Sequence, residues 1–242
     1  MNNTILKVKD LHKSYNKSKT YAVKNVSFEI HEKEIVGLVG KNGAGKSTII
    51  KSITGILPFE QGEISICNFN VNTSPINAKF NLGFVPDVCN AYDKMTGMEY
   101  LNFIADIFGV NKKEREIRFK ELQENFPLGE SIHKLISSYS HGMKQKISIM
   151  ASLVSYPKLW ILDEPITGLD PQTYTNLLNY MKDYASKGNA ILFSSHNLDV
   201  VEKICNRTII INNGNKVADL NIKEFMKTSK IPLEQYFMEL VK

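Results

Sequence analysis

The chain has 242 residues, of which 43% are hydrophobic and 23% charged, and its formal net charge is +5. This composition is typical of a globular protein, and the length allows one large domain or two unequal ones. Lysines and acidic residues are interspersed rather than gathered into basic runs, so we expect no nucleic-acid partner. The three cysteines lie far apart without zinc-ligand spacing, and we expect reduced, partly buried thiols.

The sequence also lacks the signals of a secreted or membrane-spanning protein. Its first ten residues contain no apolar core of a secretory signal peptide. No run reaches the roughly 18 apolar residues that a membrane-spanning helix requires. We therefore expect a cytoplasmic protein that reaches a membrane only through another protein.

The first part of the chain alternates strand-like and helical patterns. Apolar and polar residues alternate over 4–30, around the polar segment 16–20, and predict antiparallel edge strands and hairpins. The apolar run 34–40 predicts a strand buried on both faces, and the periodic run 46–57 predicts a helix. Alternation returns over 62–71 and predicts another strand.

The second part contains a long helical stretch and then further buried strands. We predict a helix over 98–126 and another that has Ser140 as its N-cap. The remaining predicted elements are a strand at 158–165, a helix at 171–187, a strand at 189–196, a hairpin at 208–220 and a helical tail. Buried strands separated by helices indicate an α/β fold with a mostly parallel sheet.

A helix-only stretch between the two groups of strands indicates an inserted helical subdomain. Within a single domain over 1–242, we expect a catalytic core at 1–88 and 150–220, a helical subdomain at 89–149 and a helical tail at 221–242.

The sequence GKNGAGKST lies between a predicted buried strand and a predicted helix and has the spacing G-x-x-x-x-G-K-[ST]. Its glycines let the backbone turn N–H groups toward a chain of phosphates. Lys46 would neutralise the β- and γ-phosphates, and the Ser47 hydroxyl would ligate Mg²⁺. The residues predicted to bind the nucleotide here are Gly40, Lys41, Asn42, Gly43, Ala44, Gly45, Lys46, Ser47 and Thr48.

The sequence LWILDEP supplies the second half of such a site. Its apolar residues predict a buried strand whose end carries Asp163 toward the metal, while Glu164 can orient or deprotonate a water. An Asp-Glu pair at a strand end often only meets solvent. Downstream of a phosphate loop and followed by Pro165, it predicts a catalytic role.

The sequence SYSHGMKQ predicts a second anion site. Exposed N–H groups at the start of a helix favour an anion through hydrogen bonds and the helix dipole, and Ser140 and Gly142 lie at such a start. The chain thus contains two anion sites that are far apart in the sequence.

Four motifs of this chain, in their order, resemble those of ATP-binding-cassette (ABC) nucleotide-binding domains. They are GKNGAGKST, YSHGMKQK, LWILDEPITGLDP and LFSSH, and the resemblance covers nearly the whole chain. The sequence YSHGMKQ is similar to this motif in one branch of ABC exporters. In that branch the membrane subunits are separate chains, as in bacitracin-type, antimicrobial-peptide and ABC-2 systems. The resemblance implies a P-loop NTPase core with an N-terminal antiparallel β region and an inserted helical subdomain.

The resemblance also implies where the second anion site acts. In this family two domains close head to tail and share two ATP molecules, so Ser140 and Gly142 would face the γ-phosphate held by the other chain. His141 and Met143 stand where the family has Gly and Gln, and a backbone role tolerates both changes.

Three further positions match the family's motifs. Tyr15 in KSY matches the aromatic residue that stacks on adenine, although it could simply pack in the β region. His196 after LFSS matches the histidine that contacts the γ-phosphate, although a lone histidine at a strand end is often incidental. Asp170 in TGLDP matches the loop that crosses the dimer interface, and it could also, or instead, cap the helix that begins at Pro171.

One position departs from the family. A glutamine that contacts Mg²⁺ and the membrane subunits is expected where LGFVPDVCN has Asp87. Aspartate is shorter and charged, and it could hold Mg²⁺ through a water. Acidic residues occur at this place in the suspected exporter branch.

We therefore expect an ATPase subunit of an ABC transporter, with ATP and Mg²⁺ as cofactors and Glu164, His196 and Lys46 as catalytic residues. It would pair with a second ABC ATPase subunit and lie in the cytoplasm, on the inner face of the cell membrane. There it would power a separate membrane permease that exports a peptide, a lipid or a drug. The alternatives are a soluble ABC ATPase in cofactor assembly or one in translation or DNA repair. Proteins of the last kind carry two cassettes or a long coiled-coil insertion, and this chain shows one P-loop and no such insertion.

Overall fold

The structure is a computed structural model that describes residues 3–15, 21–88 and 92–242. Its strands are β1 (Thr4–Ser14), β2 (Tyr21–His31), β3 (Ile35–Val39), β4 (Gln61–Ile66), β5 (Phe69–Asn70), β6 (Leu82–Val85), β7 (Leu159–Asp163), β8 (Ala190–Ser195), β9 (Arg207–Asn212) and β10 (Asn215–Asn221). Its helices are α1 (Lys46–Ile53), α2 (Pro75–Phe80), α3 (Gly97–Ile107), α4 (Lys112–Asn125), η1 (Gly129–His133), η2 (Ile136–Ser138), α5 (His141–Leu153), α6 (Pro171–Ser186), α7 (Leu198–Ile204), α8 (Ile222–Thr228) and α9 (Leu233–Leu240), where η marks a 3₁₀ helix. Within these ranges, no helix is both long and apolar enough to cross a bilayer.

The N-terminal β region is an antiparallel sheet with the strand order β2-β1-β4-β5, as the alternating pattern predicts. β1 pairs with β2 on one side and with β4 on the other, so the expectation of an edge strand is wrong for β1. The predicted strand 62–71 is also divided. Cys67 and Asn68 have φ angles of 48° and 67° and turn the chain between β4 and β5.

The larger sheet has the strand order β10-β9-β3-β8-β7-β6 and is mostly parallel, which confirms the predicted α/β class. β3 pairs with β8 and β9, and β7 pairs with β6 and β8, all in parallel. Every residue of β3 and β7 is buried, as continuous apolar runs predict. β10 forms the predicted hairpin with β9, and Asn213 and Gly214 in its turn both have positive φ angles.

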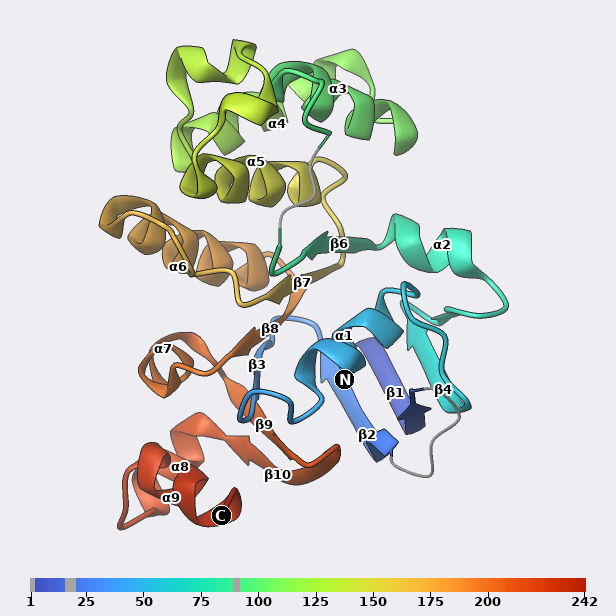
Figure 1. Cartoon of the computed structure of the whole chain (residues 1–242), viewed down its shortest axis with the longest axis vertical. Helices are drawn as coiled ribbons and strands as arrows, with labels where there is room; N and C mark the ends of the chain where they lie inside the picture. Colours follow the sequence, from blue (N-terminus) through green and yellow to red (C-terminus); the bar gives the residue numbers. More distant parts are fainter. Residues whose placement is uncertain (1–2, 16–20, 89–91) are drawn as a thin grey trace.

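Figure 1 shows α3, α4 and α5 gathered at one end of the molecule and α8 and α9 at the other. The predicted helix 98–126 is divided, because the chain turns at Gly109 (φ 64°) and Asn111 then caps α4. α1 ends at Ile53, shortly before Gly55 with its φ of 70°, rather than at residue 57. The elements α2, β6 and α7 were not predicted, because they are too short for a periodic pattern to be recognised.

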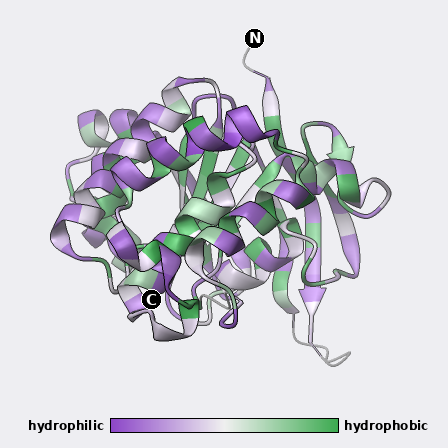
Figure 2. Ribbon diagram, turned by 90° about the horizontal axis from the view of Figure 1, so that it is seen from above, coloured by the Kyte–Doolittle hydropathy of each residue, from purple (hydrophilic) through white to green (hydrophobic). Residues whose placement is uncertain are grey.

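Two hydrophobic clusters meet at the larger sheet, and β3 contributes to both. Val36 and Leu38 belong to the cluster shared with the antiparallel sheet, while Ile35 and Val39 belong to the cluster that contains residues of α5 and α6. In Figure 2, hydrophobic residues concentrate on the strands and on inward helix faces, and hydrophilic residues face outward. β3 is therefore fixed from both faces, and so is the start of the loop that follows it.

Candidate active site

The loop between β3 and α1 requires glycine at several positions. Gly43 and Gly45 have φ angles of 79° and 112°, a region that residues with side chains rarely adopt. A Cβ atom on Gly45 would lie 2.6 Å from the carbonyl oxygen of Ala22, and one on Gly40 would lie 2.4 Å from that of Ile211. The backbone curl that the motif predicts is therefore present.

Backbone and lysine hydrogen bonds hold this loop in place. The Gly214 N–H in the β9–β10 turn donates to the Ala44 carbonyl at 2.9 Å, and the Ala44 N–H donates to the Lys41 carbonyl at 3.0 Å. The Lys46 side chain is almost entirely buried, and its ammonium donates to the Gly40 carbonyl at 2.8 Å. The loop is preformed around a cation suited to a chain of phosphates.

The end of β7 brings a buried carboxylate to this loop. Asp163 is 2% exposed, and its Oδ1 atom accepts hydrogen bonds from the Ser47 hydroxyl at 3.3 Å and from the Ser194 hydroxyl at 2.6 Å. The Ser194 oxygen in turn accepts the Glu164 N–H at 3.0 Å. Oxygen ligands from the P-loop and β7 therefore converge at one point.

Glu164 lies next to two further predicted residues. Its carboxylate is 3.0 Å from Nδ1 of His196 and 4.0 Å from the ammonium of Lys46. The Glu164 side chain is 19% exposed, whereas that of His196 is 68% exposed. A largely buried carboxylate thus stands between the lysine of the P-loop and a histidine that remains open to solvent.

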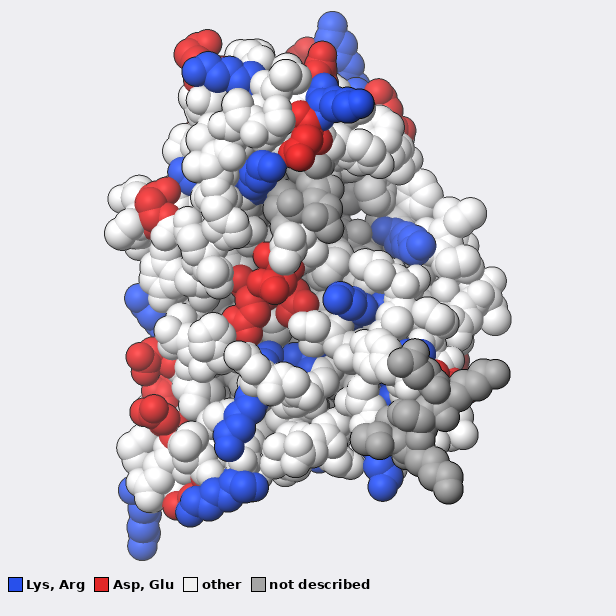
Figure 3. Space-filling model, viewed as in Figure 1, with Lys and Arg blue, Asp and Glu red and all other residues white. Residues whose placement is uncertain are grey.

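A cavity of about 470 Å³ adjoins the loop and Glu164, whereas Asp163 and His196 do not line it. It is lined by Ala22, by P-loop residues 42–48 and by Tyr15, Asp87 and Glu164. The Tyr15 side chain is 47% exposed, and its hydroxyl lies 3.1 Å from that of Thr48. In Figure 3, acidic side chains gather at mid-height on one face of the molecule, directly above a group of basic side chains. The structure brings Tyr15, the P-loop, Asp87 and Glu164 around one cavity, and Asp163 contacts it through Ser47.

Ser140 and Gly142 do not line that cavity. The Ser140 hydroxyl caps α5 by accepting the Met143 N–H at 3.3 Å, which confirms the predicted N-cap. A Cβ atom on Gly142 would lie 2.8 Å from the carbonyl oxygen of Gly168. Within its own chain, this helix start therefore packs against the segment that follows Glu164.

Asp170 ends the same segment and caps α6. Its carboxylate accepts the Thr173 N–H at 2.9 Å and the Thr173 hydroxyl at 2.7 Å, and it lies 3.0 Å from the Lys146 ammonium. The hydrogen bonds from Thr173, together with Lys146, hold the pKa of Asp170 well below its ordinary value. The predicted N-cap is confirmed, and the predicted role at a dimer interface stays a prediction.

Comparison with known proteins decides the family. The family model described as ABC transporter matches residues 23–167. The chain belongs to the ABC transporter family. It is 33% identical over 242 residues to the ABC-type transporter ATP-binding protein EcsA of Bacillus subtilis, which covers 99% of this chain and 97% of EcsA. It is 36% identical over 214 residues to the linearmycin resistance ATP-binding protein LnrL of the same species, which covers 88% of this chain and 68% of LnrL.

A solved structure described as the ATP-binding subunit of an ABC transporter superposes on this ABC chain with a TM-score of 0.93. The two chains are 33% identical, and the match covers 99% of this chain and 100% of the other. Together these likenesses confirm the predicted ABC fold and the ATPase activity. The chain is the ATP-binding subunit of an ABC transporter.

Two residues of this ABC site were not singled out from the sequence. Ser194 links Asp163 to the Glu164 backbone, and the only signal for it is its place in LFSSH. Gln145 is 2% exposed, and its amide donates to the Pro165 carbonyl at 3.1 Å, which ties α5 to the residue after Glu164. A sequence pattern does not show such contacts, because the partners come from separate elements.

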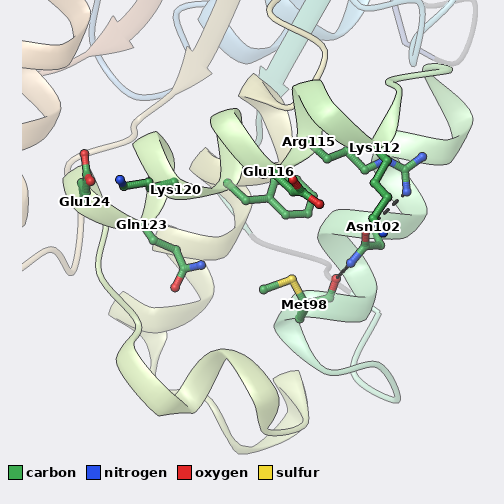
Figure 4. A pocket seen from close by; sticks show the side chains of 9 residues that line it. Met98, Asn102, Lys112, Arg115, Glu116, Lys120, Gln123 and Glu124 are labelled. Atoms are coloured by element: carbon green, nitrogen blue, oxygen red, sulfur yellow. Dashed lines mark hydrogen bonds between the residues drawn. The ribbon is translucent and has the colours of Figure 1, made fainter.

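A larger pocket of about 640 Å³ lies between α3 and α4, away from these motifs. Figure 4 shows Arg115 and Asn102 side by side at this pocket, with Met98 near them. The residues that line it are Met98, Asn102, Lys112, Arg115, Glu116, Phe119, Lys120, Gln123 and Glu124. It contains no residue of the nucleotide motifs, so its size does not make it the catalytic site.

Proposed function

We propose that this ABC ATPase binds ATP with Mg²⁺ in the cavity between Tyr15 and Glu164 and pairs with a second ABC ATPase subunit. Hydrolysis then powers a separate membrane permease that exports a peptide, a lipid or a drug. The observation that carries the proposal is the position of the Glu164 carboxylate, 3.0 Å from His196 and 4.0 Å from Lys46, at the wall of the P-loop cavity.

The cavity suits a nucleotide from end to end. Adenine would stack on the exposed ring of Tyr15, and the phosphates would lie against the N–H groups of the P-loop. Lys46 would then exchange its bond to the Gly40 carbonyl for the phosphate oxygens, which carry more charge.

The oxygen atoms near Asp163 fit Mg²⁺. The Ser47 hydroxyl and the Asp163 carboxylate approach to 3.3 Å, and both are the hard ligands that this ion prefers. These two residues would hold the ion, and Asp87, which lines the cavity together with Ser47, would bind it through a water. When bound, Mg²⁺ would neutralise phosphate charge and orient the terminal phosphate.

Glu164 would activate the attacking water. Its carboxylate takes a proton from the water as the water oxygen attacks the γ-phosphorus, and the bond to the β–γ bridging oxygen breaks with its electron pair leaving on ADP. Lys46 stabilises the charge on the γ-phosphate oxygens, and His196 orients the carboxylate.

The second subunit completes the site in this proposal. The α5 N-terminus is an anion site by its dipole and its N–H groups, and Ser140 and Gly142 lie outside the cavity of their own chain. They would therefore meet the γ-phosphate bound by the partner, with Asp170 at the interface between the two subunits.

Complementation between two inactive variants tests this arrangement. Lys46→Ala removes the P-loop cation and Ser140→Arg blocks the α5 N-terminus, so each homodimer should be inactive. An equimolar mixture should recover about a quarter of the parent ATPase rate, because half of the dimers are mixed and each carries one intact site. No recovery by a mixture that forms mixed dimers would contradict sharing between subunits.

One relative supports a role in transport, and a second supports export. EcsA aligns with this chain over almost its full length and is named a transporter ATP-binding protein. LnrL is named a linearmycin resistance protein, and removal of a compound from the cell is one way in which a transporter confers resistance.

Asp87 and the neighbouring residues up to Tyr100 are our proposed contact with the permease, although residues 89–91 lie outside the described residues.

Co-expression with a candidate membrane permease, sought first in the neighbouring reading frames, tests the transport proposal. A transporter subunit should sediment with membranes only when that protein, expected to carry about six apolar spans, is present. An ABC ATPase that remains in the cytosolic fraction in both cases would instead support the alternative in cofactor assembly.

A further inference from the structure

One carboxylate fixes the two residues that precede Tyr15. Glu60 lies between α1 and β4, and its Oε2 atom accepts the Ser14 N–H at 2.8 Å. Its Oε1 atom lies 2.8 Å from the Lys13 ammonium. The Glu60 N–H also donates to the His12 carbonyl at 3.1 Å. The end of β1 is thus tied to a segment that has no part in the nucleotide motifs.

Lys13 links Glu60 to the aromatic ring of Tyr15. The lysine is 8% exposed, and its ammonium lies 5.8 Å from the centroid of the Tyr15 ring. A cation at this distance is attracted to the face of an aromatic ring. Lys13 and Glu60 do not line the nucleotide cavity, whereas Tyr15 does, so the pair supports the ring without contacting the nucleotide.

The Glu60 carboxyl is an anion at neutral pH. Partial burial of Glu60 raises the pKa of its carboxyl, but hydrogen bonds from Lys13 and from the Ser14 backbone outweigh burial and hold the pKa below its ordinary value. Near neutral pH, Glu60 therefore accepts the hydrogen bonds from Lys13 and from the Ser14 N–H as an anion.

We propose that Glu60 is the positioning residue for the adenine end of the site, acting through Lys13 and Ser14 on Tyr15. The inference rests on the proposed stacking of adenine on Tyr15. A ring already held in place loses less conformational freedom when the base binds, so the restraint strengthens ATP binding without taking part in hydrolysis. The bond between the Tyr15 and Thr48 hydroxyls holds the far end of the same ring.

Kinetics of Glu60→Ala in the full chain test this proposal. The KM for ATP should rise about twofold, less than on loss of the ring itself, with kcat close to that of the parent, because stacking contributes equally in the ground and transition states. Binding of inorganic tripolyphosphate, which lacks a base, should be unchanged. A fall in kcat, or weaker tripolyphosphate binding, would show a general structural role and overturn the proposal.

Two companion variants make the result specific. Glu60→Gln keeps an acceptor for the Ser14 N–H but removes the charge that faces Lys13, so its KM for ATP should fall between those of the parent and Glu60→Ala. Glu63→Gln is the control: Glu63 lies on the neighbouring strand β4 and accepts a hydrogen bond from Asn70 at 3.3 Å, and its loss should leave the KM unchanged. An equal rise in both glutamine variants would overturn the proposal.

The double variant Glu60→Ala/Tyr15→Ala separates this inference from the function on which it rests. If Glu60 acts through Tyr15, the double variant should match Tyr15→Ala alone, whereas a further weakening would overturn the inference. If Tyr15→Ala leaves the KM for ATP unchanged, the proposed adenine stacking fails and the inference fails with it. If Tyr15→Ala weakens ATP and Glu60→Ala does not, only the positioning role of Glu60 is wrong.

Discussion

The two ends of the nucleotide cavity are built in different ways. At the phosphate end, backbone hydrogen bonds and the lack of space for a Cβ atom at Gly40 and Gly45 fix the loop. At the base end, Tyr15 is held by the side chains of Glu60, Lys13 and Thr48. A site built from backbone tolerates few changes, whereas a site built from side chains can be weakened in small steps. Substitutions at the two ends should therefore differ in the size and the kind of their effect.

The largest effect is expected from Lys46→Ala at the phosphate end. It removes a buried cation from the loop, and the loss of a group that stabilises transition-state charge lowers kcat by roughly 10²- to 10³-fold. Single-turnover hydrolysis measures it. Lys51→Ala, an exposed lysine on the same helix, is the control and should hydrolyse ATP like the parent. Activity in Lys46→Ala near the parent level would mean that the phosphates bind elsewhere.

Asp87→Ala changes the wall of the cavity and should separate transport from hydrolysis. If Asp87 transmits movement to the permease, transport should fall about tenfold while the ATPase rate of the isolated subunit changes little. The paired measurement is hydrolysis by the subunit alone and transport by the complete complex in lipid. An equal loss in both preparations would restrict Asp87 to the metal.

Tyr15→Ala at the base end should have a smaller effect, and on a different quantity. Loss of a stacking aromatic should weaken ATP by roughly 1 kcal/mol, which raises the KM about fivefold and leaves kcat nearly unchanged. Tyr15→Phe keeps the ring and loses only the hydrogen bond to Thr48, so its KM for ATP should rise by no more than that of Glu60→Ala. ATP titrations of both variants would rule out stacking if each binds like the parent.

The smallest effect on catalysis is expected at Lys41, a P-loop residue whose side chain is hydrogen-bonded to the C-terminal segment. The Lys41 ammonium donates to the Val241 carbonyl at 2.7 Å, and Val241 is 3% exposed. Lys41 was predicted to bind the nucleotide, but its side chain contacts Val241 and does not line the cavity. Lys41→Met should therefore lower the free energy of unfolding by about 1 kcal/mol and leave kcat unchanged. Urea denaturation measures this loss, with Lys24→Met as the exposed control. A large fall in kcat would assign Lys41 a direct contact with the nucleotide.

The features that could be predicted from the sequence have local causes. Glycines at 43 and 45 predict a curl because a positive φ angle depends on each residue's own backbone. The buried strands β3 and β7 appear as continuous apolar runs, and the β9–β10 turn appears as Asn-Gly. The order of the motifs then indicated the family, which the comparisons confirm.

The features that could not be predicted depend on residues far apart in the chain. Glu60 and Ser14 are separated by 46 positions, and Ser194 and Asp163 by 31, and neither pair follows a local pattern. β1 looked like an edge strand because alternation reports which face is buried but not how many neighbours a strand has. The helix breaks at Gly55 and Gly109 were missed because an isolated glycine only sometimes ends a helix.

The measurement that most directly tests the central claim, activation of water by Glu164, is the ATPase rate of Glu164→Gln alongside its ATP affinity. Glutamine keeps the shape but cannot take the proton, so turnover should fall by a factor on the order of 10² or more with ATP binding retained. Gel filtration with ATP and Mg²⁺ should then show two subunits held together by unhydrolysed nucleotide. The control is Glu116→Gln, an exposed glutamate on α4. A Glu164→Gln subunit that hydrolyses ATP at the parent rate and elutes as a monomer would contradict the account.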